Sequence, residues 1–123
     1  MILQRIRAAA KPATQIPKPQ STDIYTVVGW GQSRGEKALV YRLPTKSGTK
    51  KASEKRITES AFVAGFEVLQ KSGELTREWF KRNFPALERD GGCNFTTLGG
   101  ILELIGEAQY AGPGVYKKTK TAG

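Results

Sequence analysis

Two adjacent glycines lie in the middle of a helical apolar pattern near the end of the chain. Apolar side chains recur there at spacings of three and four residues: Leu98, Ile101, Leu102 and Ile105. This periodicity predicts a helix that begins near Asn94, Thr96 or Thr97 and ends before Gly106. Glycine inside a helix costs about 1 kcal/mol relative to alanine. We therefore expect Gly99 and Gly100 to permit close packing of another element against this helix.

Local start and stop signals predict two further helices upstream. Thr58 precedes an apolar pattern that ends at Gly73, which predicts a helix over about 59–72. Thr76 can cap a second helix, with an apolar face of aromatic residues, that ends near Pro85. Between them, the pattern GELT predicts a very short strand around Leu75. The polar stretch ALERDGGC is expected to be a loop.

The N-terminal half shows a different composition. Residues 1–21 contain three prolines among small and polar residues, which predicts a basic arm that is disordered or extended. Residues 22–43 hold two β-rich runs, YTVVGW and ALVYRL, around a polar loop and predict a β-hairpin. Residues 44–57, TKSGTKKASEKR and its neighbours, are expected to be a flexible basic linker.

The order of the C-terminal elements resembles the winged-helix variant of the helix-turn-helix. It runs helix, short strand, helix, loop, helix, and then a hairpin that pairs EAQY with VYKK across AGPG. The resemblance covers residues 58–119, with 120–123 as a tail, and identifies no particular family. It implies an α+β protein: an N-terminal β-hairpin followed by a three-helix winged-helix domain, with the C-terminal hairpin as the wing.

The net charge points to a polyanionic partner. The 123 residues include 20 Lys and Arg against 11 Asp and Glu, which gives a formal charge of +9. Residues 58–106 carry five basic and seven acidic groups, so the surplus lies in the arm, the hairpin, the linker and the tail. Such segments can follow a phosphate backbone without a shaped pocket.

These observations predict a small protein that binds duplex DNA mainly through phosphates, as a regulator of transcription or an accessory factor in replication or recombination. The third helix carries no Lys or Arg, so base reading would depend on polar groups at its start. The candidate nucleic-acid-binding residues are Arg34, Lys37, Lys50, Lys51, Lys55, Arg56, Arg77, Lys81, Arg82, Asn94, Thr96, Thr97, Lys117, Lys118 and Lys120.

Two other functions remain open: a protein-interaction module that forms a homodimer or joins a complex, and RNA binding with tyrosines as a stacking surface. An enzyme is not expected, because the chain has no histidine and its carboxylates show no paired spacing. The single cysteine and the missing histidine also argue against a zinc site, and no cofactor or metal is expected. With no apolar run of membrane-spanning length, the chain is expected to be cytoplasmic, or nucleoid-associated if it binds DNA.

Overall fold

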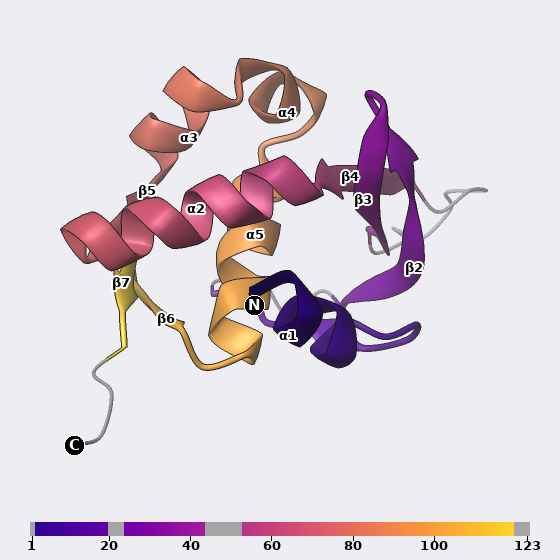
Figure 1. Ribbon diagram of the computed structural model, residues 1–123, viewed down its shortest axis with the longest axis horizontal. Helices are drawn as coiled ribbons and strands as arrows, with labels where there is room; N and C mark the ends of the chain where they lie inside the picture. The colour runs from indigo at the N-terminus through magenta and orange to yellow at the C-terminus, as the bar shows by residue number, and fades with distance from the viewer. Residues whose placement is uncertain (1, 20–23, 44–52, 120–123) are drawn as a thin grey trace.

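Two antiparallel sheets and five helices make up the part of the chain that the computed structural model describes, residues 2–19, 24–43 and 53–119. The first sheet has the strand order β1-β2-β3-β4, and the second has the order β5-β7-β6. Figure 1 shows α2 crossing the middle of the molecule, with the first sheet at one end and β7 at the other. The elements are α1 (Ile2–Ala9), β1 (Gln15–Ile16), β2 (Tyr25–Ser33), β3 (Glu36–Arg42), β4 (Glu54–Thr58), α2 (Glu59–Ser72), β5 (Glu74–Thr76), α3 (Arg77–Asn83), α4 (Pro85–Asp90), α5 (Cys93–Leu104), β6 (Ala108–Gly112) and β7 (Val115–Lys118).

The winged-helix prediction is wrong. The N-terminal hairpin is not a separate unit, because β2 and β3 belong to a four-stranded sheet whose last strand, β4, leads directly into α2. One core joins the sheet to the helices: Leu39 and Tyr41 of β3 are fully buried in the same cluster as Phe62 of α2 and Leu98 of α5. The extra helices α1 and α4 also depart from a three-helix arrangement.

The N-terminal segment differs from the expected arm. Residues 2–19 form α1 and β1, and Ile6, Ala10 and Ile16 enter the core. Arg5 forms an ion pair with Glu107, and Arg7 forms one with Glu59 of α2. A few apolar residues, together with ion pairs to distant parts of the chain, fix this segment in spite of its polar composition.

The β2–β3 hairpin is present but is longer than predicted. The two strands continue to Ser33 and Glu36, so Arg34 and Gly35 alone form the turn instead of a loop over 31–37. Both turn residues have positive φ angles, 52° and 80°, as a two-residue turn of type I′ requires. The predicted linker is also partly a strand: residues 54–58 form β4 and pair with β3, while residues 44–52 lie outside the described ranges.

The first two predicted helices are confirmed, and residues next to their ends determine where α2 ends and where α3 begins. α2 spans Glu59–Ser72 and ends at Gly73, whose φ of 81° is left-handed. Thr76 caps α3, since its hydroxyl accepts a hydrogen bond of 3.1 Å from the Trp79 amide. The expected loop after α3 is instead the helix α4, which Pro85 begins at its first turn.

The third predicted helix, α5, lies at the centre of the fold and packs as its glycines predicted. Eight of its residues are buried, from Asn94 to Leu102. A Cβ atom at Gly99 would overlap the ring of Tyr116 in β7, and one at Gly100 would overlap the carbonyl oxygen of Pro17. The terminal hairpin β6–β7 is present, and β7 also pairs with β5, so Leu75 lies opposite Tyr116.

Candidate nucleic-acid interface

The residues predicted to read bases at the start of α5 are not available for that role. Asn94 and Thr97 are fully buried, and Thr96 is partly buried. The Asn94 side chain accepts a hydrogen bond of 2.6 Å from the Tyr41 hydroxyl and donates one of 2.7 Å to the Leu87 carbonyl. These groups connect α5 to β3 and α4. The burial of Asn94 and Thr97 argues against base contacts at these two residues, because other parts of the chain cover this turn.

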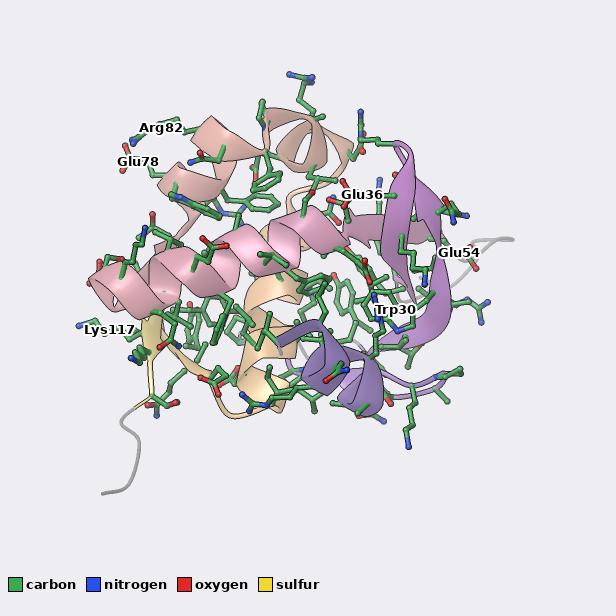
Figure 2. All side chains as sticks on the ribbon, in the orientation of Figure 1. Trp30, Glu36, Glu54, Glu78, Arg82 and Lys117 are labelled. Carbon is green, nitrogen blue, oxygen red and sulfur yellow. The ribbon has the colours of Figure 1, made fainter. Side chains whose placement is uncertain are left out.

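The predicted residues of α3 have two different environments. Arg77 is partly buried, with its guanidinium 3.1 Å from a Glu88 carboxylate oxygen and 3.0 Å from the Gly92 carbonyl oxygen. It also lies over the ring of Phe95, 5.0 Å from the ring centroid. Lys81 and Arg82 are exposed, and Figure 2 shows Arg82 pointing away from the body of the molecule. Arg77 thus connects α3 to α4 and α5, whereas its two neighbours face solvent.

Strands β2, β3 and β4 with their connections, residues 24–58, form a unit that we call the basic meander. It contains eight basic and two acidic residues in the sequence, so it carries six of the nine net positive charges. Four predicted site residues lie on its described part: Arg34, Lys37, Lys55 and Arg56. Lys50 and Lys51 fall in the connection between β3 and β4, outside the described residues.

The described cations of the meander interact mainly with neutral carbonyl groups or form ion pairs that solvent weakens. Arg56 donates a hydrogen bond of 2.7 Å to the Gln32 carbonyl, and Lys55 donates one to the Asp90 carbonyl. Arg34 and Arg42 each lie 3.4 Å from a carboxylate, that of Asp90 and that of Glu54, in ion pairs whose side chains are 41–53% exposed, so solvent screens both pairs. Lys37 is exposed. The meander therefore presents positive charge that few carboxylates offset.

The terminal lysines lie far from the meander. Lys117 and Lys118 are exposed on β7, and Lys120 is outside the described residues. Figure 2 shows Lys117 and Glu54, which begins β4, at opposite ends of the long axis of the molecule. The predicted binding residues thus do not form one continuous patch.

A polar cluster at the first turn of α5 was missed by sequence reasoning. The Lys18 ammonium group donates hydrogen bonds to the Thr97 and Thr96 hydroxyls, at 2.7 and 2.8 Å, and to the Cys93 carbonyl at 3.1 Å. It lies 4.1 Å from the centroid of the Tyr25 ring. No local pattern marks Lys18, because it stands in a proline-containing stretch and meets its partners through the fold.

Burial changes the acid–base behaviour of this cluster. Desolvation of the ammonium group, to which the nearby Arg77 charge adds, lowers the pKa of Lys18 to about 8. The Cys93 thiol has the opposite, smaller effect on that pKa. Desolvation raises the pKa of the Tyr41 hydroxyl above its ordinary value, as does its hydrogen bond with Cys93. Lys18 is therefore charged at neutral pH but loses its proton more easily than an exposed lysine.

This lowered pKa predicts a stability change with pH. Between pH 8 and the ordinary lysine value of 10.5, the unfolded chain keeps the Lys18 proton that the folded chain releases, so the free energy of unfolding contributed by Lys18 rises with pH. We expect this contribution to grow by about 1–2 kcal/mol from pH 7.5 to 9.5. Urea unfolding of the protein and of Lys18→Met at both pH values measures it, with Cys93→Ser in both chains to remove the neighbouring thiol. Identical pH profiles of the two chains would contradict the prediction.

Comparison with protein-family models, with curated proteins and with solved structures gives no match to this chain. The described residues contain no cluster of three or more His, Cys, Asp or Glu side chains that could hold a metal ion. None of the helices in the described ranges is both long enough and apolar enough to cross a membrane. Functional inference therefore depends on the charges and geometry of the chain itself.

Proposed function

We propose that this protein binds duplex DNA through the backbone phosphates, with the basic meander as its main contact. The observation that carries the proposal is the concentration of charge: eight basic and two acidic residues within 24–58. The strands β2, β3 and β4 hold the described members of this group at one end of the molecule (Figure 1). Each phosphate that a lysine or arginine neutralises releases condensed counterions, which drives binding at low salt.

The structure of the meander fits this role. β4 is an edge strand of its sheet, so Lys55 and Arg56 lie on an element that no further strand covers among the described residues. Both side chains donate to main-chain carbonyls, so their charges are not cancelled by those hydrogen bonds. The connection that follows β3 adds Lys46, Lys50 and Lys51 to the same unit.

The proposed binding is independent of base sequence. Asn94 and Thr97 are buried in the core, and α5 carries no lysine or arginine for reading guanine. Contacts to phosphates alone position a protein on DNA but carry no sequence information. An accessory role on DNA inside the cell, with a nucleoid-associated location, agrees with such binding.

Fluorescence anisotropy with two 25-base-pair duplexes of unrelated sequence tests the proposal. We expect the two affinities to agree within a few-fold and log affinity to fall linearly with log salt between about 50 and 200 mM. Replacing Lys46, Lys50 and Lys51 with alanine should lower the salt slope by up to about 3, because each lost phosphate contact removes about 0.9. It should weaken binding about tenfold or more at 50 mM salt.

The matched control removes the same charge from another surface. Lys71, Lys81 and Arg82 are exposed on α2 and α3, and their replacement with alanine should change the affinity and the slope much less. Equal effects of the two triple variants would show that only net charge matters and would overturn the assignment to the meander. If the protein binds no duplex at about 50 mM salt, DNA binding itself fails.

A further inference from the structure

A pocket lies where the terminal hairpin meets α3, α5 and the start of β2. Its volume is about 320 Å³, at the small end of the range for pockets that hold small molecules. The side chains that give it chemical character are Lys18, Arg77, Thr96, Tyr25 and Tyr110, and Pro113 of the β6–β7 turn adds an apolar wall. A polar, cationic part and an aromatic part thus share one small space.

Among the described residues, no carboxylate offsets the positive charge of Lys18 in the cationic part. Within the described residues, the hydrogen-bond acceptors of Lys18 are two hydroxyls and one carbonyl, all neutral. The nearby groups that act on its pKa are the Cys93 thiol and Arg77, which is another cation. Buried charges in proteins are normally paired with an opposite charge. An anion in the pocket would supply the missing partner.

Arg77 is placed to take part in binding that anion. Its Nη1 and Nη2 atoms donate to Glu88 and to the Gly92 carbonyl. A guanidinium has five N–H donors in a planar fork, so these contacts leave donors for a phosphate. The Arg77 amide also donates a 2.9 Å hydrogen bond to the Gly114 carbonyl, which fixes the start of α3 against the hairpin turn. The guanidinium is therefore held in position before any ligand binds.

The aromatic part is held in position in the same way. Tyr110 makes an edge contact with Tyr116 at a centroid distance of 5.6 Å, and Tyr25 makes a tilted contact with Tyr41 at 6.5 Å. Both supporting tyrosines are fully buried. Rings fixed from behind lose little freedom on binding and suit a planar ligand.

We propose that this pocket binds a single nucleotide, with its phosphate bound by the remaining N–H donors of Arg77 and attracted by the Lys18 charge, and with its base against Tyr25 and Tyr110. The nucleotide can be a free nucleoside monophosphate or one unpaired nucleotide of a strand, because the two share this chemistry. The inference does not depend on duplex binding, since Lys18 and Arg77 lie outside the basic meander.

Isothermal titration calorimetry with the full chain at pH 7.5 and about 50 mM salt tests the proposal. The probes are thymidine monophosphate, thymidine, inorganic phosphate and a single-stranded oligothymidylate of eight nucleotides. We expect the monophosphate to bind at least tenfold more tightly than thymidine or phosphate alone, since each of these fills half of the site. In the variant without Lys46, Lys50 and Lys51, much tighter binding of the oligonucleotide than of the monophosphate would identify a strand as the source, and equal affinities would identify the free nucleotide.

Two independent variants and one control make the outcome decisive. Lys18→Met and Tyr110→Leu should each weaken monophosphate binding at least tenfold, and heat-induced unfolding checks that each variant is folded. Lys37→Met removes an exposed charge on β3 and should leave this affinity unchanged. Phosphate binding as tight as monophosphate binding, no binding of any probe at millimolar concentration, or unchanged affinity in a folded variant at Lys18 or Tyr110 would overturn the proposal.

The same titration separates this site from the duplex interface. The variant without Lys46, Lys50 and Lys51 should keep its full affinity for thymidine monophosphate. Loss of monophosphate binding in that variant would show that the anion binds to the meander and would overturn the assignment to the pocket. Duplex binding can fail without affecting these results, because the thymidine monophosphate arm contains no duplex.

Discussion

Gly100→Ala should lower the free energy of unfolding by about 3 kcal/mol, at the upper end of the usual cost of an overpacked core. The new methyl group would overlap the Pro17 carbonyl oxygen and would lie 3.1 Å from the Ile16 Cγ2 atom. The first of these neighbours is backbone, which cannot rotate out of the way as a side chain could. Alanine also stabilises a helix by about 1 kcal/mol relative to glycine. The expected change in the free energy of unfolding is therefore the cost of the overlap minus this gain.

Gly92→Ala provides the matched control for this measurement. Gly92 precedes α5, its φ of −61° suits any residue, and a Cβ atom there would meet only Arg77 Nη1, at 3.9 Å. We expect its free energy of unfolding in urea to stay within about 0.5 kcal/mol of the original protein. If Gly100→Ala were equally stable, the segment around Pro17 would not pack on α5 as the structure has it.

The overlap at Gly100 also affects the proposed nucleotide site. Pro17 directly precedes Lys18, whose ammonium group reaches the first turn of α5. A shift of the Pro17 backbone away from α5 would move that ammonium group relative to Arg77 and Thr96. Gly100 therefore does more than allow a compact core, because it sets the depth at which the N-terminal segment lies against α5.

Sequence reasoning succeeded where a signal is local. The helix 59–72 has an apolar period, and Gly73 ends it; Thr76 caps the next helix with its own hydroxyl. The tight packing at Gly99 and Gly100 was predicted because glycine weakens a helix, and close approach of a neighbouring element offsets that cost. In each case the residues that determine the structure lie within a few positions of it.

Elements that depend on distant partners could not be predicted in this way. The mean composition of residues 1–21 is dominated by prolines and polar residues, so it did not predict the burial of Ile6 and Ile16. Their burial depends on the sheet and on α5. β4 resembled a linker because its apolar content is a single isoleucine, and pairing with β3 makes it a strand. The combination of these elements into one core is what excluded the winged-helix arrangement.

The candidate site shows the same limit. Asn94 and Thr97 were candidate caps, which are often exposed, but Gly92 is the N-cap of α5, and Tyr41 and Lys18 lie over the two side chains. The sequence separations are 53 and 79 residues, so no local pattern signals either contact. Charge predicts exposure to solvent better than hydrogen-bonding capacity does, because lysines stay near the surface in almost any fold.

Ile6→Ala should lower the free energy of unfolding by about 3 kcal/mol, which is within the range for removing a fully buried isoleucine side chain. Ile6 is the buried residue of α1, and its neighbours in the core come from segments far along the sequence. An isolated helix of eight residues is not stable in water, so α1 depends on this contact. The measurement is urea unfolding followed by the fluorescence of the two tryptophans, one of which, Trp30, donates a hydrogen bond from its indole to the Ala10 carbonyl.

Gln4→Ala, at an exposed position of the same helix, is the control and should change stability by less than about 0.5 kcal/mol. If α1 were instead a loose arm, Ile6→Ala and Gln4→Ala would have the same small effect. Hydrogen exchange of the amides in residues 6–10 adds a second readout, because docking of α1 slows exchange and a free arm exchanges at once. A docked α1 places Arg5 and Arg7 in ion pairs with Glu107 and Glu59. The two carboxylates offset the charge of these arginines, and the basic meander carries six of the nine net positive charges, so it is the principal source of charge for binding DNA.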